Sequence, residues 1–77
     1  MSNIKEHERI VLTADVAADG LVAGDVGTVV HCYADGLAYE VEFTTLDGHT
    51  AAVATLEAAQ VRPVGRHEIT HARALAA

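Results

Sequence analysis

Residues 37–43 alternate apolar and polar side chains with a period of two. One side carries Tyr39, Val41 and Phe43, and the other side carries Glu40 and Glu42. Successive side chains of a β-strand point to opposite faces, so this alternation predicts a strand with one buried and one exposed face. The centre of the chain is therefore expected to belong to a half-exposed β-sheet.

Four other segments carry strand signals in the form of β-branched, aromatic or small apolar residues. They are residues 8–13, 26–33, 49–55 and 61–64. Asp-Gly pairs at 35–36 and 47–48 mark tight turns, and residues 56–60 are helix formers that suffice for one 3₁₀ turn. The pattern predicts an all-β fold, a small five-stranded SH3-like barrel with a short 3₁₀ turn before its last strand. An open sheet covered by a tail helix is the structural alternative.

The chain after Pro63 differs in composition from the predicted strands. Residues 65–77 contain helix-forming Ala, Arg, Glu and Leu, with Ile69, Ala72 and Leu75 roughly on one side. A helix of about thirteen residues is marginal unless it docks on another surface. We therefore expect a barrel over residues 1–64 and a C-terminal tail over residues 65–77 that is helical or disordered.

The length of the chain, 77 residues, and its one cysteine, Cys32, limit the class of protein. A chain this short forms one domain with a thin core, and dimerisation is expected to help stabilise it. A lone cysteine excludes an internal disulfide and a four-cysteine zinc site, and the apolar runs are shorter than the ~20 residues of a membrane span. The acidic and polar start of the chain is unlike a signal peptide, so a cytoplasmic location is expected.

The charge of the chain argues against nucleic acid as a partner. Eleven acidic and five basic residues give a formal net charge of −6, which repels phosphate backbones. Gly24 and Gly27 could form a phosphate-cradling loop of the KOW type, but Asp25 lies between them and basic residues are scarce. We expect no nucleic-acid or membrane partner, and the two glycines are expected to permit a turn into a bulged, curved strand.

Four motifs in a fixed order resemble the DUF4926 family of uncharacterised bacterial domains. They are Gly24-Asp25-Val26-Gly27-Thr28-Val29-Val30, Ala38-Tyr39-Glu40-Val41-Glu42-Phe43, Asp47-Gly48 and Leu56-Glu57-Ala58-Ala59-Gln60-Val61-Arg62-Pro63. The resemblance runs from about Glu8 to Pro63; it implies an SH3-like barrel and transfers no catalytic residues. A looser similarity to nitrile hydratase β subunits rests on the Gly-x-x-Gly-Thr-Val and Tyr-x-Val-x-Phe strands and implies a fold and a subunit-docking habit.

The tail contains a His-Glu-x-x-His match, His67-Glu68-Ile69-Thr70-His71. On a helix this motif places two imidazoles on one face for a zinc ion, with the glutamate as general base. The histidine-rich composition makes the match a weak indication. A third ligand has to come from upstream, and the candidates are His7, His31, His49, Asp47 and Glu57. We therefore keep His67 and His71 as candidate metal ligands, and expect no catalytic residue and no cofactor.

Two further residue pairs are considered for chemistry. His31 and Cys32 are neighbours on a predicted strand, so they face opposite ways and cannot act together as a nucleophile pair. Cys32 is expected in the core and His31 at the surface. Glu40 and Glu42 could form a paired acid–base site, but nothing apolar in the neighbouring sequence is placed to raise the pKa of either carboxyl.

These observations predict a non-enzymatic, SH3-like protein-binding module that binds a basic protein partner and forms a homodimer. The residues expected to contact the partner are Tyr39, Glu40 and Glu42 on the sheet and Asp19 and Asp25 in the loop after the first strand. An antitoxin- or immunity-like role is one version of this function. The alternative is an accessory subunit or metal-delivery helper of a metalloenzyme, similar to nitrile hydratase, and a hydrolase that uses Glu68 is a third class.

Overall fold

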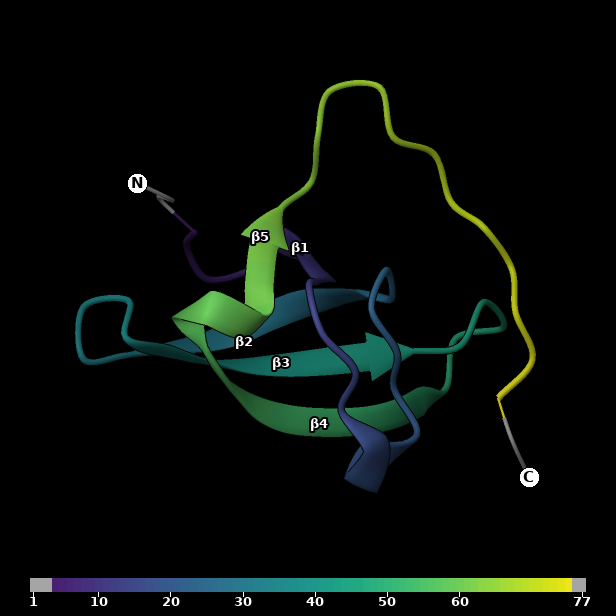
Figure 1. Ribbon diagram of the computed structural model, residues 1–77, viewed down its shortest axis with the longest axis horizontal. Coiled ribbons are helices and arrows are strands. Elements are labelled where there is room, and N and C mark those ends of the chain that lie inside the picture. Colours follow the sequence, from purple (N-terminus) through teal and green to yellow (C-terminus); the bar gives the residue numbers. More distant parts are fainter. Residues whose placement is uncertain (1–3, 76–77) are drawn as a thin grey trace.

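The computed structural model describes residues 4–75, and it consists of one antiparallel sheet with two single 3₁₀ turns (Figure 1). The strands are β1 (Arg9–Leu12), β2 (Val26–Tyr33), β3 (Ala38–Thr44), β4 (Thr50–Glu57) and β5 (Val61–Pro63), and the 3₁₀ turns are η1 (Ala17–Asp19) and η2 (Ala58–Gln60). Their order in the sheet is β4-β3-β2-β1-β5. The all-β prediction, the five strands and the 3₁₀ turn before the last strand are confirmed.

Asp or Gly occupies most left-handed positions of the predicted hairpin turns, and Ala34, with a φ of 46°, is the exception. Asp35 and Gly36 have φ values of 57° and 95° in the turn between β2 and β3, and Gly48 has a φ of 94° in the turn between β3 and β4. Glycine adopts this conformation without a steric penalty, and aspartate does so more readily than most residues. The turn chemistry therefore sets where the two long hairpins reverse.

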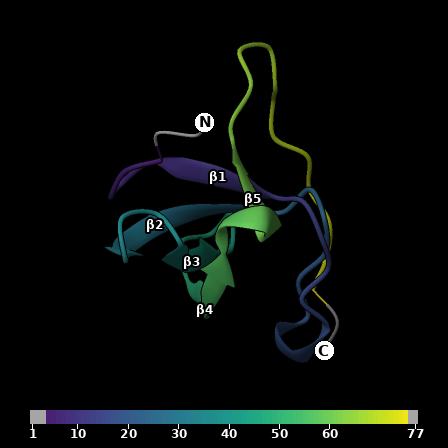
Figure 2. The same ribbon diagram turned by 60° about the vertical axis from the view of Figure 1, so that its left-hand side comes forward.

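The sheet is strongly twisted, but its hydrogen-bonded ladder is not closed. In Figure 2, β1 and β2 run across the view while β3 and β4 are seen nearly end-on. A register shift between Val29 and His31 adds a bulge to β2, and a bulge increases local twist. Because β4 and β5 form the two edges of the ladder, the strand pairing of residues 4–75 does not confirm a closed barrel.

The concave side of the sheet holds the core. Its buried residues are Ile4, Ile10, Leu12, Leu21, Val29, Tyr39, Val41, Phe43, Ala54, Leu56 and Val61, with Cys32 partly buried against them. Tyr39 is only 2% exposed because it lies on the same side of β3 as Val41 and Phe43. Its ring is therefore not available to a partner in this fold, contrary to the expectation that it is a contact residue.

Gly27 lies beneath this core. A Cβ atom at Gly27 would lie 2.6 Å from Cγ1 of Val41 and 2.8 Å from Cε2 of Phe43. Val41 and Phe43 of β3 occupy the space that a side chain at position 27 would need. Glycine therefore permits these side chains to pack closely against the backbone of β2. Gly24, with a φ of 95°, supplies the turn that leads into β2.

The tail is extended and has one turn at residues 66–67, so the expectation of a helix is wrong for residues 65–75. The side chains of Glu68 and Arg73 are bound to other parts of the chain, as described below, and an extended segment reaches both contact points. A short isolated helix has little stability of its own to oppose these contacts. Residues 1–3 of the expected domain and residues 76–77 of the expected tail lie outside the described residues.

Candidate functional site

The outward side of strands β2, β3 and β4 carries the two glutamates that the sequence singled out. In the strand register, Glu40 lies between His31 of β2 and Thr55 of β4, and Glu42 lies between Thr28 and Val53. Residues directly opposite one another in an antiparallel sheet share a face. We call this surface the acidic face; its members are Thr28, His31, Tyr33, Glu40, Glu42, Val53, Thr55 and Glu57.

Neighbouring hydroxyl groups hold the carboxylates of the acidic face in place. Thr55 Oγ1 donates a hydrogen bond of 2.5 Å to Oε1 of Glu40, and the Tyr33 hydroxyl lies 3.4 Å from the same oxygen. Thr50 Oγ1 donates a bond of 2.6 Å to Oε2 of Glu42. Both glutamates remain partly exposed, so each carboxylate is oriented and can still accept bonds from outside the protein.

Tyr33 adds an aromatic surface to the acidic face. Tyr33 is 40% exposed, and its ring makes an edge contact with His31, with 4.5 Å between the ring centroids. The negative charge of Glu40 is the main cause of a raised pKa of the Tyr33 hydroxyl. An aromatic ring beside a carboxylate suits a cationic side chain, which can pair with the carboxylate and lie against the ring.

Of the sheet residues that the sequence predicts as partner contacts, Glu40 and Glu42 lie on the acidic face and Tyr39 does not. Tyr33, not Tyr39, is the exposed tyrosine, and Glu57 at the end of β4 faces outward opposite Ala38. The alternation of β3 could have assigned Tyr39 to the buried face, because it shares the parity of Val41 and Phe43. The bulge in β2 shifts the parity of its second half, so that His31 and Tyr33 face outward and Cys32 faces inward. The expected positions of His31 and Cys32 agree with this shift, and the same parity could have placed Tyr33 beside His31.

The two predicted aspartates lie in a different region, the loop between β1 and β2. Asp19 is exposed in η1. Asp25 is only 17% exposed and pairs with Arg73 of the tail, with 2.8 Å between Arg73 Nε and Oδ1 and 2.5 Å between Nη2 and Oδ2. The hydrogen bond from Arg73 is the main cause of the lowered pKa of Asp25. The structure thus brings Glu40 and Glu42 together but places Asp25 in a separate site that the tail occupies.

The His-Glu-x-x-His motif lies on the extended tail, where no helix aligns His67 with His71. Glu68 forms a two-pronged pair with Arg62, with 2.9 Å and 2.7 Å between nitrogen and oxygen, and accepts a bond from the Gly65 amide. These bonds, that from Arg62 first, lower the pKa of Glu68 to about 2. A carboxylate held in this way is a poor general base.

The upstream histidines do not complete a metal site around the motif. Within residues 4–75, no three His, Cys, Asp or Glu side chains are grouped so that they could hold a metal ion. His31 lies 3.4 Å from Glu6, and His49 lies 3.3 Å from Asp47, so each has an acidic neighbour in its own part of the fold. The arrangement of the described residues therefore does not favour His67 and His71 as ligands.

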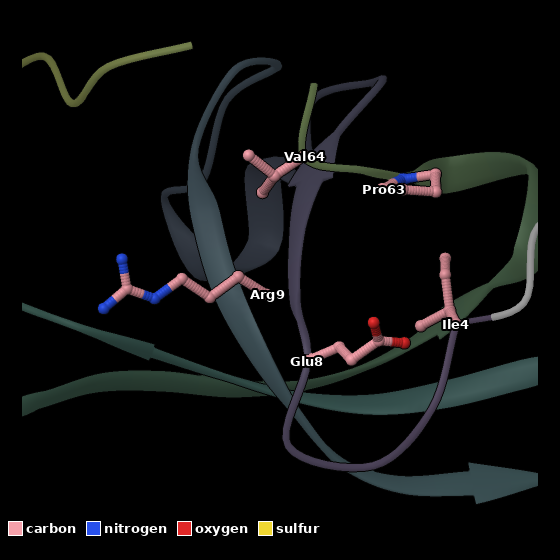
Figure 3. A pocket seen from close by; sticks show the side chains of 5 residues that line it. All are labelled: Ile4, Glu8, Arg9, Pro63 and Val64. Carbon is pink, nitrogen blue, oxygen red and sulfur yellow. The ribbon is translucent and has the colours of Figure 1, made fainter. Parts of the chain in front are cut away.

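A hollow beside β1 and β5 is lined by Ile4, Glu8, Arg9, Pro63 and Val64 (Figure 3). The Glu8 carboxylate points toward Ile4, and the Arg9 guanidinium points away from both. Oε1 of Glu8 accepts a bond of 2.6 Å from the Lys5 amide. The hollow thus offers one carboxylate that is already bonded, and it has no second group for acid–base chemistry.

These features define a small antiparallel β-sheet domain whose distinctive chemistry lies on its surface. Residues 6–63 match the model of DUF4926, described as a domain of unknown function, and the chain belongs to this family. No curated protein and no solved structure matches the chain, so the looser similarity to nitrile hydratase β subunits is without support. None of the helices in residues 4–75 has the length and apolar character that crossing a bilayer requires.

Proposed function

We propose that this protein is a protein-binding module that recognises a basic partner through the acidic face. The observation that carries the proposal is the grouping of Glu40, Glu42 and Glu57 on one outward side of the sheet, next to the exposed ring of Tyr33. The eight residues of the acidic face include no lysine or arginine, and Arg9 of β1, opposite Thr28, adds one cation at the β1 side of that surface. A partly exposed acidic surface with an aromatic contact point complements a basic surface of another protein.

The order of elements supports an SH3-like roll as the scaffold of this module. β1 pairs with both β2 and β5, and η2 leads directly into β5. We propose that the twisted sheet is an SH3-like barrel whose last two strands approach without pairing. An antitoxin- or immunity-like role toward a basic protein fits this surface. The homodimer and the cytoplasmic location stay predictions; light scattering of the purified protein tests the first.

The proposal is tested by comparing three forms of the protein as bait at physiological salt. They are the wild type, the double variant Glu40→Gln/Glu42→Gln, and the control Asp35→Asn/Asp47→Asn, which removes two charges from the hairpin turns. Glutamine keeps the oxygen that accepts the threonine bonds, so the sheet should stay folded, and circular dichroism checks this. We expect the wild type and the control to retain a basic partner from the native host and the Glu40/Glu42 variant to lose it.

Two results would contradict the proposed function. One is the recovery of no protein partner by a wild type that is also monomeric in solution. The other is equal retention of the partner by the Glu40/Glu42 variant, because charge complementarity is the stated cause of binding. A partner held through the acidic face should also dissociate faster as the salt concentration rises.

The metal-delivery alternative also stays a prediction, and no contact in the described residues favours it. Elemental analysis of the purified protein, beside His67→Ala and His71→Ala variants, tests it. Bound metal that both substitutions remove would support a helper role, and the same metal content in all three forms would contradict it.

A further inference from the structure

The guanidinium of Arg73 is bound by three oxygen atoms of the β1–β2 loop. Its Nε and Nη2 atoms pair with the two carboxylate oxygens of Asp25, and Nη2 also lies 3.1 Å from the carbonyl oxygen of Gly20. A planar guanidinium matches such a fork of acceptors, whereas a lysine ammonium cannot make the two parallel bonds. We call this set of oxygens, from Asp25 and Gly20, the arginine seat.

Contacts within the loop hold the arginine seat, without help from the tail. Oδ2 of Asp25 accepts a bond of 2.9 Å from the Val22 amide, and Oδ1 of Asp15 accepts a bond of 2.9 Å from the Ala23 amide. The backbone of Leu12 bonds to both Gly24 and Asp25, at 2.8 Å and 2.9 Å. The position of the Asp25 carboxylate is therefore set before Arg73 arrives.

The tail that delivers Arg73 is attached at few points. Figure 1 shows it arching away from β5 and returning to the side of the molecule where the β3–β4 turn lies. A groove lies between residues 21–26, the turn at residues 43–47 and the tail. Ile69 is 93% exposed, and Leu75 is about half exposed. The hydrogen bonds and the ion pair that the structure shows for residues 69–75 all belong to Arg73, so this part of the tail is held through one side chain.

We propose that the arginine seat recognises an arginine in an extended segment of the basic partner, and that Arg73 fills the seat until that segment displaces it. The inference rests on the proposed function in that the arginine belongs to the same basic partner. The groove beside the seat, with the exposed Val22, Val26 and Leu46 among its lining residues, gives the flanking residues of that segment an apolar surface. A tethered competitor acts at an effective concentration on the order of millimolar, so the partner must bind the seat more tightly than the tail does.

The probe for this proposal is a blocked peptide with the sequence of residues 69–75, titrated into the full-length protein labelled with ¹⁵N. In the Arg73→Ala variant the seat is empty, and we expect shifts in the amide signals of Gly20, Val22 and Asp25. The wild type should need at least tenfold more peptide for the same shifts, because its own Arg73 competes. A peptide that carries citrulline in place of arginine should leave these signals unchanged, and a lysine peptide should bind more weakly than the arginine peptide.

The citrulline peptide makes the test decisive without any substitution in the loop, because citrulline is close in shape to arginine but carries no charge. Absence of shifts in the Arg73→Ala variant, or equal shifts from the citrulline peptide, would overturn the arginine seat. A wild-type dimer that dissociates on Arg73→Ala substitution would also overturn it, since the occupant would then be the tail of a second copy.

The outcome also separates this inference from the proposed function. If the arginine peptide does not bind the seat, but the Glu40→Gln/Glu42→Gln variant still fails to bind the basic partner, only this inference is wrong. If the arginine peptide binds the seat as expected, but that variant binds the partner as strongly as the wild type does, only the proposed function is wrong.

Discussion

The sheet and the tail of this protein are held by different physical forces. The sheet is organised around Val29 and Val41, which are fully buried, and each of its three middle strands pairs on both sides. The described tail from residue 64 onward is exposed throughout, and arginine–carboxylate pairs hold it at two places. Burial of apolar side chains in a shared core stabilises the whole sheet. An exposed ion pair adds little to the free energy of unfolding and acts only on the segment that it holds. The comparison suggests a fixed scaffold with an exchangeable segment.

The largest expected effect comes from a cavity in the sheet. Leu56 of β4 is fully buried in the core, and Leu56→Ala should reduce the free energy of unfolding by about 2–5 kcal/mol. That is a large share of the stability of a domain this small. The control is Leu46→Ala in the β3–β4 turn, which is 82% exposed and should change it by less than about 0.5 kcal/mol. Urea denaturation measures both, and equal effects would contradict the assignment of the core.

A smaller effect is expected from comparing a glycine of the sheet with a glycine of the tail. Gly27→Ala brings a methyl group against Val41 and Phe43 and should cost about 1–3 kcal/mol of stability through overpacking. A Cβ atom at Gly65 would have the exposed side chain of Glu68 as its nearest neighbour, 3.0 Å away, where a shift of a few tenths of an ångström relieves the contact. Thermal unfolding should therefore give a clearly lowered Tm for Gly27→Ala and a Tm close to wild type for Gly65→Ala. The reverse order would show that the tail, not the sheet, controls stability.

Lowering the pH is expected to have the smallest effect on the stability of the fold. It should also separate the behaviour of the tail most clearly from that of the sheet. The pKa of Glu68 in the folded protein is about 2, below its ordinary value of 4.5, and that of Asp25 is also lowered. Carboxyls with a depressed pKa stabilise the fold above their ordinary pKa, and this contribution disappears as the pH falls toward the folded-state value. Between about pH 4.5 and 2 the tail should detach before the sheet unfolds.

Hydrogen exchange or ¹⁵N relaxation of residues 66–75, compared with β3, measures this release. The Glu68→Gln variant should already show a loosened turn at residues 65–68 at neutral pH, with little further change there on acidification. If the tail detached and the sheet unfolded at the same pH, the two regions would not be separate, and this prediction would be wrong.

Most of the sheet could be predicted from the sequence because its signals are local. The bounds of β2 agree with the prediction, and the other strands differ by one or two residues at their ends. The outward direction of Glu40 and Glu42 followed from the alternation in β3, because side-chain direction in a strand depends only on parity. Glu40 and Glu42, two of the eight residues of the acidic face, could therefore be predicted from the sequence as partner contacts.

The remaining features depend on contacts between distant parts of the chain. Tyr33 joins the acidic face after a bulge whose position depends on how β2 pairs with β3. The composition of residues 65–77 favours a helix, but the pairs Arg62–Glu68 and Asp25–Arg73 hold an extended segment instead. Helix propensity is a weak preference that tertiary contacts readily override.

The sequence by itself determined the strands, the hairpin turns and the inward or outward direction of β3, because period and turn chemistry act between neighbouring residues. Only the tertiary structure decided that Asp25 binds an arginine, since the two residues of that pair are separated by 48 positions. The folded sheet brings such residues together, and the free energy gained on contact depends on geometry that a linear pattern does not contain.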